Sequence, residues 1–297
     1  MLRRTLALLT LLALAACASP DSAGVNDAGA GDARGEVPRA PDIDRRGFVN
    51  VTYAPNDANL SRIGAGFTVV TPVPSRGTQT QREAGPCRVN VFRVDPEPLD
   101  AGVPPLPVNV SAGTVTVTGG MAPGRYTLVP DAGAIYPTAS EVGPRWAGGD
   151  RVSAEASGGE IPAFQLAVAY PSLPEILDPQ VVTAGDRVRL NRSAAYAIRR
   201  MPGTVGSARV EIFQLSRPAQ NAPPTRSVSV ICTYSITAAE LIVPAAALTD
   251  LEAATPASGP ETSIQALTMN EATTTAGSWP IRLAGVHVGL WARVDVD

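Results

Sequence analysis

Apolar and polar residues alternate with a period of two along most of the chain after residue 47. The clearest run is Leu283–Val296, in which one predicted face carries Val286, Val288, Leu290, Ala292, Val294 and Val296. Such alternation predicts β-strands with one buried and one solvated face. The first half of the chain has further runs of this kind at Phe48–Tyr53, Gly66–Thr71, Arg88–Val94, Thr114–Thr118, Arg125–Val129 and Asp150–Ser157. The second half has them at Phe164–Tyr170, Asp186–Leu190, Ala195–Arg199, Ala208–Leu215, Ser227–Ile236 and Thr262–Met269.

Glycine and proline separate these runs. Thr71–Arg82 carries two prolines and a glycine and predicts a loop, and the five prolines of Asp95–Pro107 exclude a central strand. Only Pro244–Glu252 favours a short helix, because proline suits the first helical position and the apolar residues there recur at helical spacing. We therefore predict an all-β fold of two β-sandwich halves with one short helix.

The predicted sandwich domains are residues 47–160 and 161–297, which meet near Gly158–Phe164. The strand number of the second half resembles that of an immunoglobulin or fibronectin type III sandwich. That resemblance implies architecture only, since the Cys…Trp…Cys pattern of antibody domains is absent. The junction Gly158-Gly159-Glu160-Ile161-Pro162-Ala163-Phe164 resembles a segment of predicted bacterial lipoproteins of unknown function, and it implies no activity.

The N-terminus has the parts of a secretory signal. Arg3 and Arg4 precede an apolar run, Thr5–Ala16, that is too short to span a bilayer. The run ends in Leu14-Ala15-Ala16-Cys17, which resembles the lipobox of bacterial lipoproteins. The resemblance implies a signal peptide at residues 1–16, acylation of Cys17 (detectable as palmitate), and attachment of the protein to a membrane of the cell envelope.

Residues 17–46 follow as a predicted tether. Ala, Gly and Asp dominate this stretch, and such a composition predicts disorder because it buries too little apolar surface. In the sorting rule of this family, an Asp after the lipidated cysteine retains the protein in the inner membrane. Ala18 stands at that position, so the resemblance implies the outer membrane.

The composition of the chain excludes several kinds of function. The net charge of −3 gives no strong field for nucleic acid, so no nucleic-acid partner is expected. All 24 basic residues are arginine. The absence of lysine excludes a Schiff base and a lysine-dependent phosphate loop. We expect no cofactor.

Two cysteines remain besides Cys17. Cys232 falls on the apolar face of Ser227–Ile236, and Cys87 opens the strand Arg88–Val94. A disulfide between them is one alternative, because an envelope compartment permits disulfides. Two separate buried or semi-buried thiols are the favoured interpretation.

Catalytic and metal-binding signals are weak. The single histidine, His287, falls on the predicted polar face with Arg293, Asp295 and Asp297, which favours a solvated strand residue. No nucleophile elbow and no zinc spacing accompany it. A carboxylate pair for hydrolysis needs only proximity in space; its candidates are Asp150, Glu155, Glu160, Asp178 and Asp186. The pairs Asp42/Asp44 and Asp295/Asp297 could ligate calcium but lack the rest of a calcium loop.

The sequence favours a non-enzymatic envelope lipoprotein that binds a protein or glycan partner through sandwich loops or sheet edges. The candidate contact residues are aromatic: Tyr136, Trp146, Trp279 and Trp291. Two alternatives stay open. One is a structural component of an envelope assembly, which a self-complementary edge strand would favour, and the other is an envelope hydrolase with a carboxylate site.

Overall fold

The computed structural model describes residues 44–55, 59–70, 77–94, 107–121, 124–180, 187–217, 224–253 and 260–297. Strands make up most of these residues and only one short helix lies among them, which confirms the predicted all-β class. The one helix among them, α2 (Ala245–Leu248), lies inside the predicted helical segment and is a single turn. No helix in the described ranges is long and apolar enough to cross a membrane. The predicted signal peptide, Cys17 and nearly all of the predicted tether lie outside the described residues.

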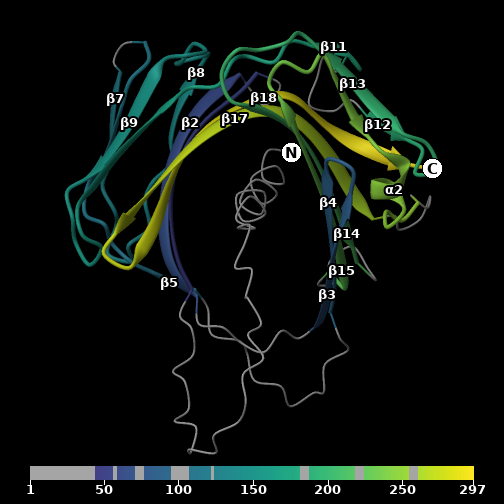
Figure 1. The fold of residues 1–297 in the computed structure, drawn as a ribbon. Helices are drawn as coiled ribbons and strands as arrows, with labels where there is room; N and C mark the ends of the chain where they lie inside the picture. The colour runs from purple at the N-terminus through teal and green to yellow at the C-terminus, as the bar shows by residue number, and fades with distance from the viewer. Residues whose placement is uncertain are drawn as a thin grey trace, which may run out of the picture. The chain divides into compact units, whose positions relative to one another are not determined.

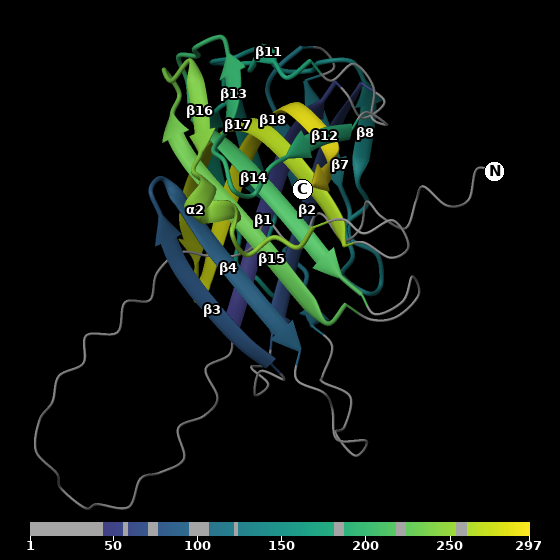
Figure 2. The same ribbon diagram turned by 90° about the vertical axis from the view of Figure 1, so that its right-hand side faces the viewer.

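An eleven-stranded mixed sheet forms the centre of the fold (Figures 1 and 2). Its strand order is β3-β4-β15-β14-β17-β18-β1-β2-β5, with β12 also paired to β18 and β8 to β2. The strands from the first half of the chain are β1 (Asp44–Ala54), β2 (Leu60–Val70), β3 (Gly77–Ala84), β4 (Cys87–Val94), β5 (Val108–Asn109) and β8 (Ala139–Val142). Those from the second half are β12 (Arg187–Leu190), β14 (Ser207–Ser216), β15 (Arg226–Ser235), β17 (Glu261–Ala276) and β18 (Trp279–Val296).

The two halves of the chain share this sheet. β4 pairs antiparallel with β15, and β1 pairs parallel with β18. The predicted boundary between residues 160 and 161 therefore does not coincide with a boundary between sheets. The separation of the paired strands in the sequence explains why local alternation alone could not indicate this arrangement.

Two smaller sheets complete the fold. The four-stranded sheet has the order β10-β9-β6-β7, formed by β6 (Val115–Thr118), β7 (Arg125–Leu128), β9 (Arg151–Ala156) and β10 (Phe164–Ala169). The three-stranded sheet has the order β11-β13-β16, formed by β11 (Ile176–Asp178), β13 (Tyr196–Arg200) and β16 (Glu240–Val243).

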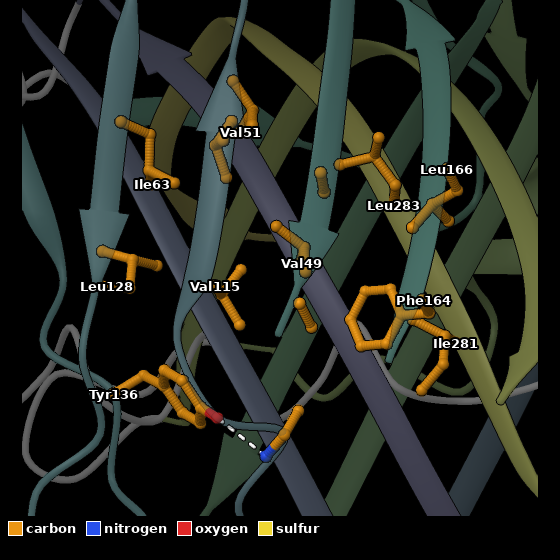
Figure 3. Packing of buried hydrophobic residues seen from close by; sticks show 14 of the residues in the cluster. Val49, Val51, Ile63, Val115, Leu128, Tyr136, Phe164, Leu166, Ile281 and Leu283 are labelled. Atoms are coloured by element: carbon orange, nitrogen blue, oxygen red, sulfur yellow. Dashed lines mark hydrogen bonds between the residues drawn. The ribbon is translucent and has the colours of Figure 1, made fainter. Parts of the chain in front are cut away.

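Both small sheets pack on the same face of the large sheet, which we call the outer face. Figure 1 shows the large sheet curved, with β7 and β9 outside β2 and with α2 and β13 outside the strands on the other side. One core lies between β1, β2, β17, β18 and the four-stranded sheet, where Val49 and Leu283 meet Val115 and Phe164 (Figure 3). The other lies between β4, β14, β15 and the layer of α2, β13 and β16, where Val210 and Val230 belong to the same cluster as Ile198 and Leu248.

A β-bulge in β18 reverses the alternation of that strand. Ala266 of β17 pairs with Leu290, but the next residue, Leu267, pairs with Val288, so Gly289 is the extra residue. Before Gly289 the odd-numbered residues face outward, and after it the even-numbered residues do. The prediction that one face carries every valine of this strand was therefore wrong for Val286 and Val288, which are only half-buried.

Two further predictions are corrected. The segment expected to be a loop, Thr71–Arg82, contains most of strand β3, which carries Thr and Gln instead of apolar residues in its first part. The two thiols expected to be separate form a disulfide between Cys87 and Cys232, which are directly opposite on β4 and β15 with Cα atoms 3.9 Å apart. The disulfide therefore fastens the outermost hairpin, β3–β4, to the rest of the sheet.

Candidate binding surface

The face of the large sheet opposite both cores, the inner face, carries a second set of apolar side chains. They alternate with the core residues on the same strands, and most are half-buried. The largest members are Phe48 on β1, Phe92 on β4, Phe213 and Leu215 on β14, Ile231 on β15, Leu267 and Met269 on β17, which are buried, and Val286, Val288 and Trp291 on β18. Every described layer that packs on the large sheet packs on its outer face (Figure 1), so no described element covers these residues.

The distribution of the bulkiest aromatic residues marks this face as unusual. The chain contains five phenylalanines and three tryptophans. Phe67, Phe164, Trp146 and Trp279 are in the outer core, whereas Phe48, Phe92, Phe213 and Trp291 lie on the inner face. A solvated sheet face is ordinarily polar, so this placement of half of the Phe and Trp residues needs a cause other than packing within the described chain.

Small residues surround some of these aromatic rings. The ring of Phe48 lies over Gly66 of the neighbouring strand, where a Cβ atom would be 2.6 Å from Cζ of Phe48. At Gly64, two residues away on the same face, a Cβ atom would meet nothing within 4 Å. Glycine therefore accommodates the ring at residue 66 and leaves open space beside it at residue 64.

Two pairs of oppositely charged residues lie on the inner face. Arg209 and Glu211 on β14 approach to 3.4 Å, and Gln265 on β17 donates a hydrogen bond of 2.5 Å to the other carboxylate oxygen of Glu211. Arg282 of β18 lies 3.6 Å from Glu271 of β17. The opposite charges within each pair compensate each other. The apolar and aromatic side chains of the inner face share that face with these two pairs.

Three of the four aromatic residues predicted as partner contacts are buried. Trp146 is 1% exposed and lies between the rings of Tyr126 and Tyr170, at centroid distances of 6.0 and 5.6 Å. The hydroxyl of Tyr136 accepts a hydrogen bond from the Ala112 amide and donates one to the Gly113 carbonyl (Figure 3). Trp279 is buried in the same core. These three side chains are enclosed by the core and offer no surface to a partner.

Trp291 is the predicted contact residue that lies on the inner face, where it is half-buried opposite Gln265. The other aromatic residues of this face were not singled out from the sequence. Phe48, Phe92 and Phe213 occur in strands in which both sets of alternating positions are partly apolar. That pattern, apolar residues on both faces of one strand, was the signal available for finding them.

His287 is buried, which corrects the prediction that it is a solvated strand residue. The bulge at Gly289 puts it on the outer face, where it is 4% exposed and its ring meets Tyr53 edge-on at a centroid distance of 4.9 Å. Its Nδ1 atom is buried and has no hydrogen-bond partner among the described residues. Burial lowers its pKa from 6.5 to about 4, so the imidazole is neutral in the folded protein at pH 7.

The candidate carboxylates are dispersed. Asp150 accepts a hydrogen bond of 2.8 Å from the Ala147 amide within a turn, and Glu155 accepts one of 2.6 Å from Gln165 on the exposed side of the four-stranded sheet. Asp178 lies 3.5 Å from Arg199, and Glu160 is exposed. None of the described contacts joins two of these carboxylates, and Asp186 lies outside the described residues.

The predicted calcium pairs are likewise separate. Asp44 pairs with Arg46, whereas Asp42 is outside the described ranges. Arg187 donates to Asp295 at 2.9 Å and lowers the pKa of that carboxyl. Within the part of the chain that the structure describes, no three His, Cys, Asp or Glu side chains are grouped to hold a metal ion.

A shallow pocket of about 480 Å³ lies where β14 ends and β15 begins. Arg93, Arg217, Arg226 and Glu252 line it together with Val94, Ser216 and Thr225. Arg226 donates to Glu252 at 3.0 Å and to the Asp250 carbonyl at 2.5 Å, and Ser216 donates to Glu252 at 2.5 Å. These bonds join the segment after α2 to the hairpin, so the charged pair of the pocket has a structural role.

Comparison with known proteins does not assign the chain to a family. No protein-family model matches the chain, and no curated protein sequence matches it. The fold defines an all-β protein with a large curved sheet, and its candidate site is the inner face of that sheet.

Proposed function

We propose that this protein is a lipid-anchored lipoprotein of the bacterial cell envelope that binds a protein partner through the inner face of its large sheet, without catalysis. The observation that carries this proposal is the placement of Phe48, Phe92, Phe213 and Trp291 on a face that no described element covers. Buried Phe and Trp side chains remove roughly 150–250 Å² each from water and dominate many interfaces. The predicted location, the outer membrane with attachment through Cys17, belongs to the same proposal.

The chemistry of the inner face favours a protein segment over a glycan. A glycan needs many free hydrogen-bonding groups, but four of the charged side chains here are engaged in the pairs Arg209–Glu211 and Arg282–Glu271. The aromatic rings are half-buried between neighbouring side chains, so they do not form exposed platforms. We therefore propose an apolar or amphipathic segment of an envelope protein as the partner, in contact with Phe213, Ile231 and Trp291.

We also propose that the folded body has the sandwich packing expected from the sequence. Two sheets enclose the core around Val49 and Val115, which supports a likeness to immunoglobulin and fibronectin type III domains at the level of layers.

Site-specific photo-crosslinking in cells tests the proposed surface. A photoreactive phenylalanine analogue at Ile231 or Val288 on the inner face is expected to give a discrete, protease-sensitive adduct. Matched positions are Val129 and Val142, which are exposed apolar residues elsewhere. Adducts from the matched positions alone, or none from the inner face, would show that this face is not the binding surface. A protease-resistant adduct that glycosidases remove would show that the partner is a glycan.

Aromatic truncation makes the same test quantitative. Phe213→Ala combined with Trp291→Ala is expected to reduce the adduct from Ile231 at least about tenfold, since two interface anchors contribute more than 1 kcal/mol each. Anchoring is tested separately with Cys17→Ala, which is expected to abolish labelling by radioactive palmitate and release the protein from membranes.

A further inference from the structure

Strand β3 is a long strand at one edge of the large sheet, and no described strand lies beyond it. At the other end of the sheet, β5 pairs with Thr68 and Val69 of β2, and β8 pairs with Leu60–Ile63. β3 pairs with β4 on one side, and no described strand lies on its other side. Thr78–Gln81 are exposed. In an antiparallel pair, alternate residues direct their N–H and C=O groups away from the partner, so the part of β3 after Gly77 offers a row of these groups.

Nothing in β3 protects this edge. Its pairing with β4 runs from Gly77 to Ala84 without a register shift, so there is no bulge, and the strand contains no proline. Its two charged residues are neutralised at the end near the turn. Arg82 donates to Asp250 at 2.6 Å, and Glu83 accepts from Arg88 at 3.3 Å. Proline, bulges and unpaired charges are the usual devices that prevent edge strands from pairing with another chain.

The edge is also held in place before any partner arrives. The disulfide Cys87–Cys232 joins the turn end of the β3–β4 hairpin to β15. The bonds from Arg82 to Thr249 and Asp250 join β3 to the residues that follow α2. A preformed edge loses little conformational entropy when a second strand is added to it.

We infer that β3 is a self-association edge, at which a second copy of this chain adds its own β3 antiparallel to form a two-fold dimer with a continuous sheet. This inference does not depend on the inner-face binding proposed above. A second copy fits because the strand is complementary to itself. A two-fold axis at Thr80 places Gln79 opposite Gln81, Thr80 opposite its own copy, and Thr78 opposite Arg82. No like charges face each other, and Thr–Thr pairs are favourable across strands.

The expected dimer is weak. A single added strand pair buries less than the roughly 1,200 Å² typical of stable complexes, so association in the micromolar range is expected in solution. Sedimentation of the full chain in detergent is expected to show a monomer–dimer equilibrium that depends on protein concentration. A single monomeric species at all concentrations up to about 200 μM would overturn the inference.

Substitutions on the edge give the sharper test. Gln79→Lys combined with Gln81→Lys places lysine opposite lysine at two symmetric positions, and is expected to weaken the dimer about tenfold or more. The matched control is Val129→Lys with Ile135→Lys, which adds the same charge at exposed sites after β7 and is expected to leave the dimer unchanged. An equal loss in both variants would indicate a general charge effect and overturn the inference. A dimer that resists both would place the interface elsewhere.

A thiol at the predicted axis reports the register. Thr80→Cys is expected to form an intermolecular disulfide under mild oxidation, because residues on a two-fold axis of paired strands have Cα atoms about 4.5–5.5 Å apart. Val129→Cys serves as an exposed control, and the unsubstituted chain gives the background. Crosslinking at Val129 as efficient as at Thr80 would contradict the proposed pairing.

Discussion

The disulfide between Cys87 and Cys232 gives the most direct quantitative prediction about this fold. The two residues are 145 positions apart, and the bond joins β4 to β15 beside the turn of the β3–β4 hairpin. In the chain-entropy description, closing a loop of that length lowers the entropy of the unfolded chain enough to stabilise the fold by about 5 kcal/mol at 25 °C. Measured effects are commonly smaller, about 2–4 kcal/mol, so we expect Cys87→Ala with Cys232→Ala to lower the free energy of unfolding by about 2–5 kcal/mol.

Urea unfolding followed by tryptophan fluorescence, together with thermal scans, measures this change. For a body of this size, a loss of about 4 kcal/mol corresponds to a decrease in Tm of roughly 10 °C. The unsubstituted protein treated with a reductant is the control, because it loses the bond but keeps both sulfur atoms in the core. An unchanged midpoint in both samples would refute the reasoning. So would reaction of Cys87 and Cys232 with a thiol reagent in urea without reductant, since a disulfide-bonded cysteine has no free thiol.

Three further predictions follow from the outer face and from the bulge. The pKa of His287 is about 4 when folded and about 6.5 when unfolded, so the unfolded chain binds the proton first and acid destabilises the fold. Unfolding free energies measured at pH 7 and pH 5 are expected to differ by about 2 kcal/mol more in the natural protein than in His287→Gln, and an equal difference would contradict this. Gly289→Ala is expected to lower the free energy of unfolding by about 1–3 kcal/mol, because a Cβ atom would be 2.7 Å from the Pro174 ring and 2.9 Å from the Pro174 carbonyl oxygen. The control Gly64→Ala places its Cβ atom where no neighbour lies within 4 Å, so it is expected to be nearly neutral in chemical denaturation. Trp146→Ala is expected to destabilise the fold by about 3–5 kcal/mol in the same assay, and a cost below about 1 kcal/mol would show that this core position is not tightly packed.

Local pattern was sufficient for the fold class and for most strands. Alternation located the core strands because each has one face in a core, as in Ser227–Ile236 and Arg88–Val94. It could not reveal Gly77–Gln81, since that part of β3 is an exposed edge and has no apolar face to mark it. Its polar residues and the prolines before it instead indicated a loop.

Contacts between distant segments account for the other differences. The pairing of β4 with β15 is a property of the topology, so the sequence alone left the disulfide open and favoured separate thiols. The bulge at Gly289 changes which side of β18 is buried, and one extra residue in a regular pattern is detectable only when the partner strand is known. The burial of His287 follows from that single residue.

The position of the bulge also matters for the proposed surface. Without it, a strand of strict alternation that buries Leu290, Ala292, Val294 and Val296 would also turn Val286 and Val288 to the core and His287 to the inner face. With it, the inner face gains Val286 and Val288, adjacent to the half-buried Trp291, and loses the imidazole to the outer side. Alternation in the sequence shows that both sets of positions in such a strand are partly apolar. It cannot distinguish a side chain that packs in a core from one that binds a partner, because both are apolar. Only the location of the other layers separates them, and every layer that the structure describes lies on the outer face.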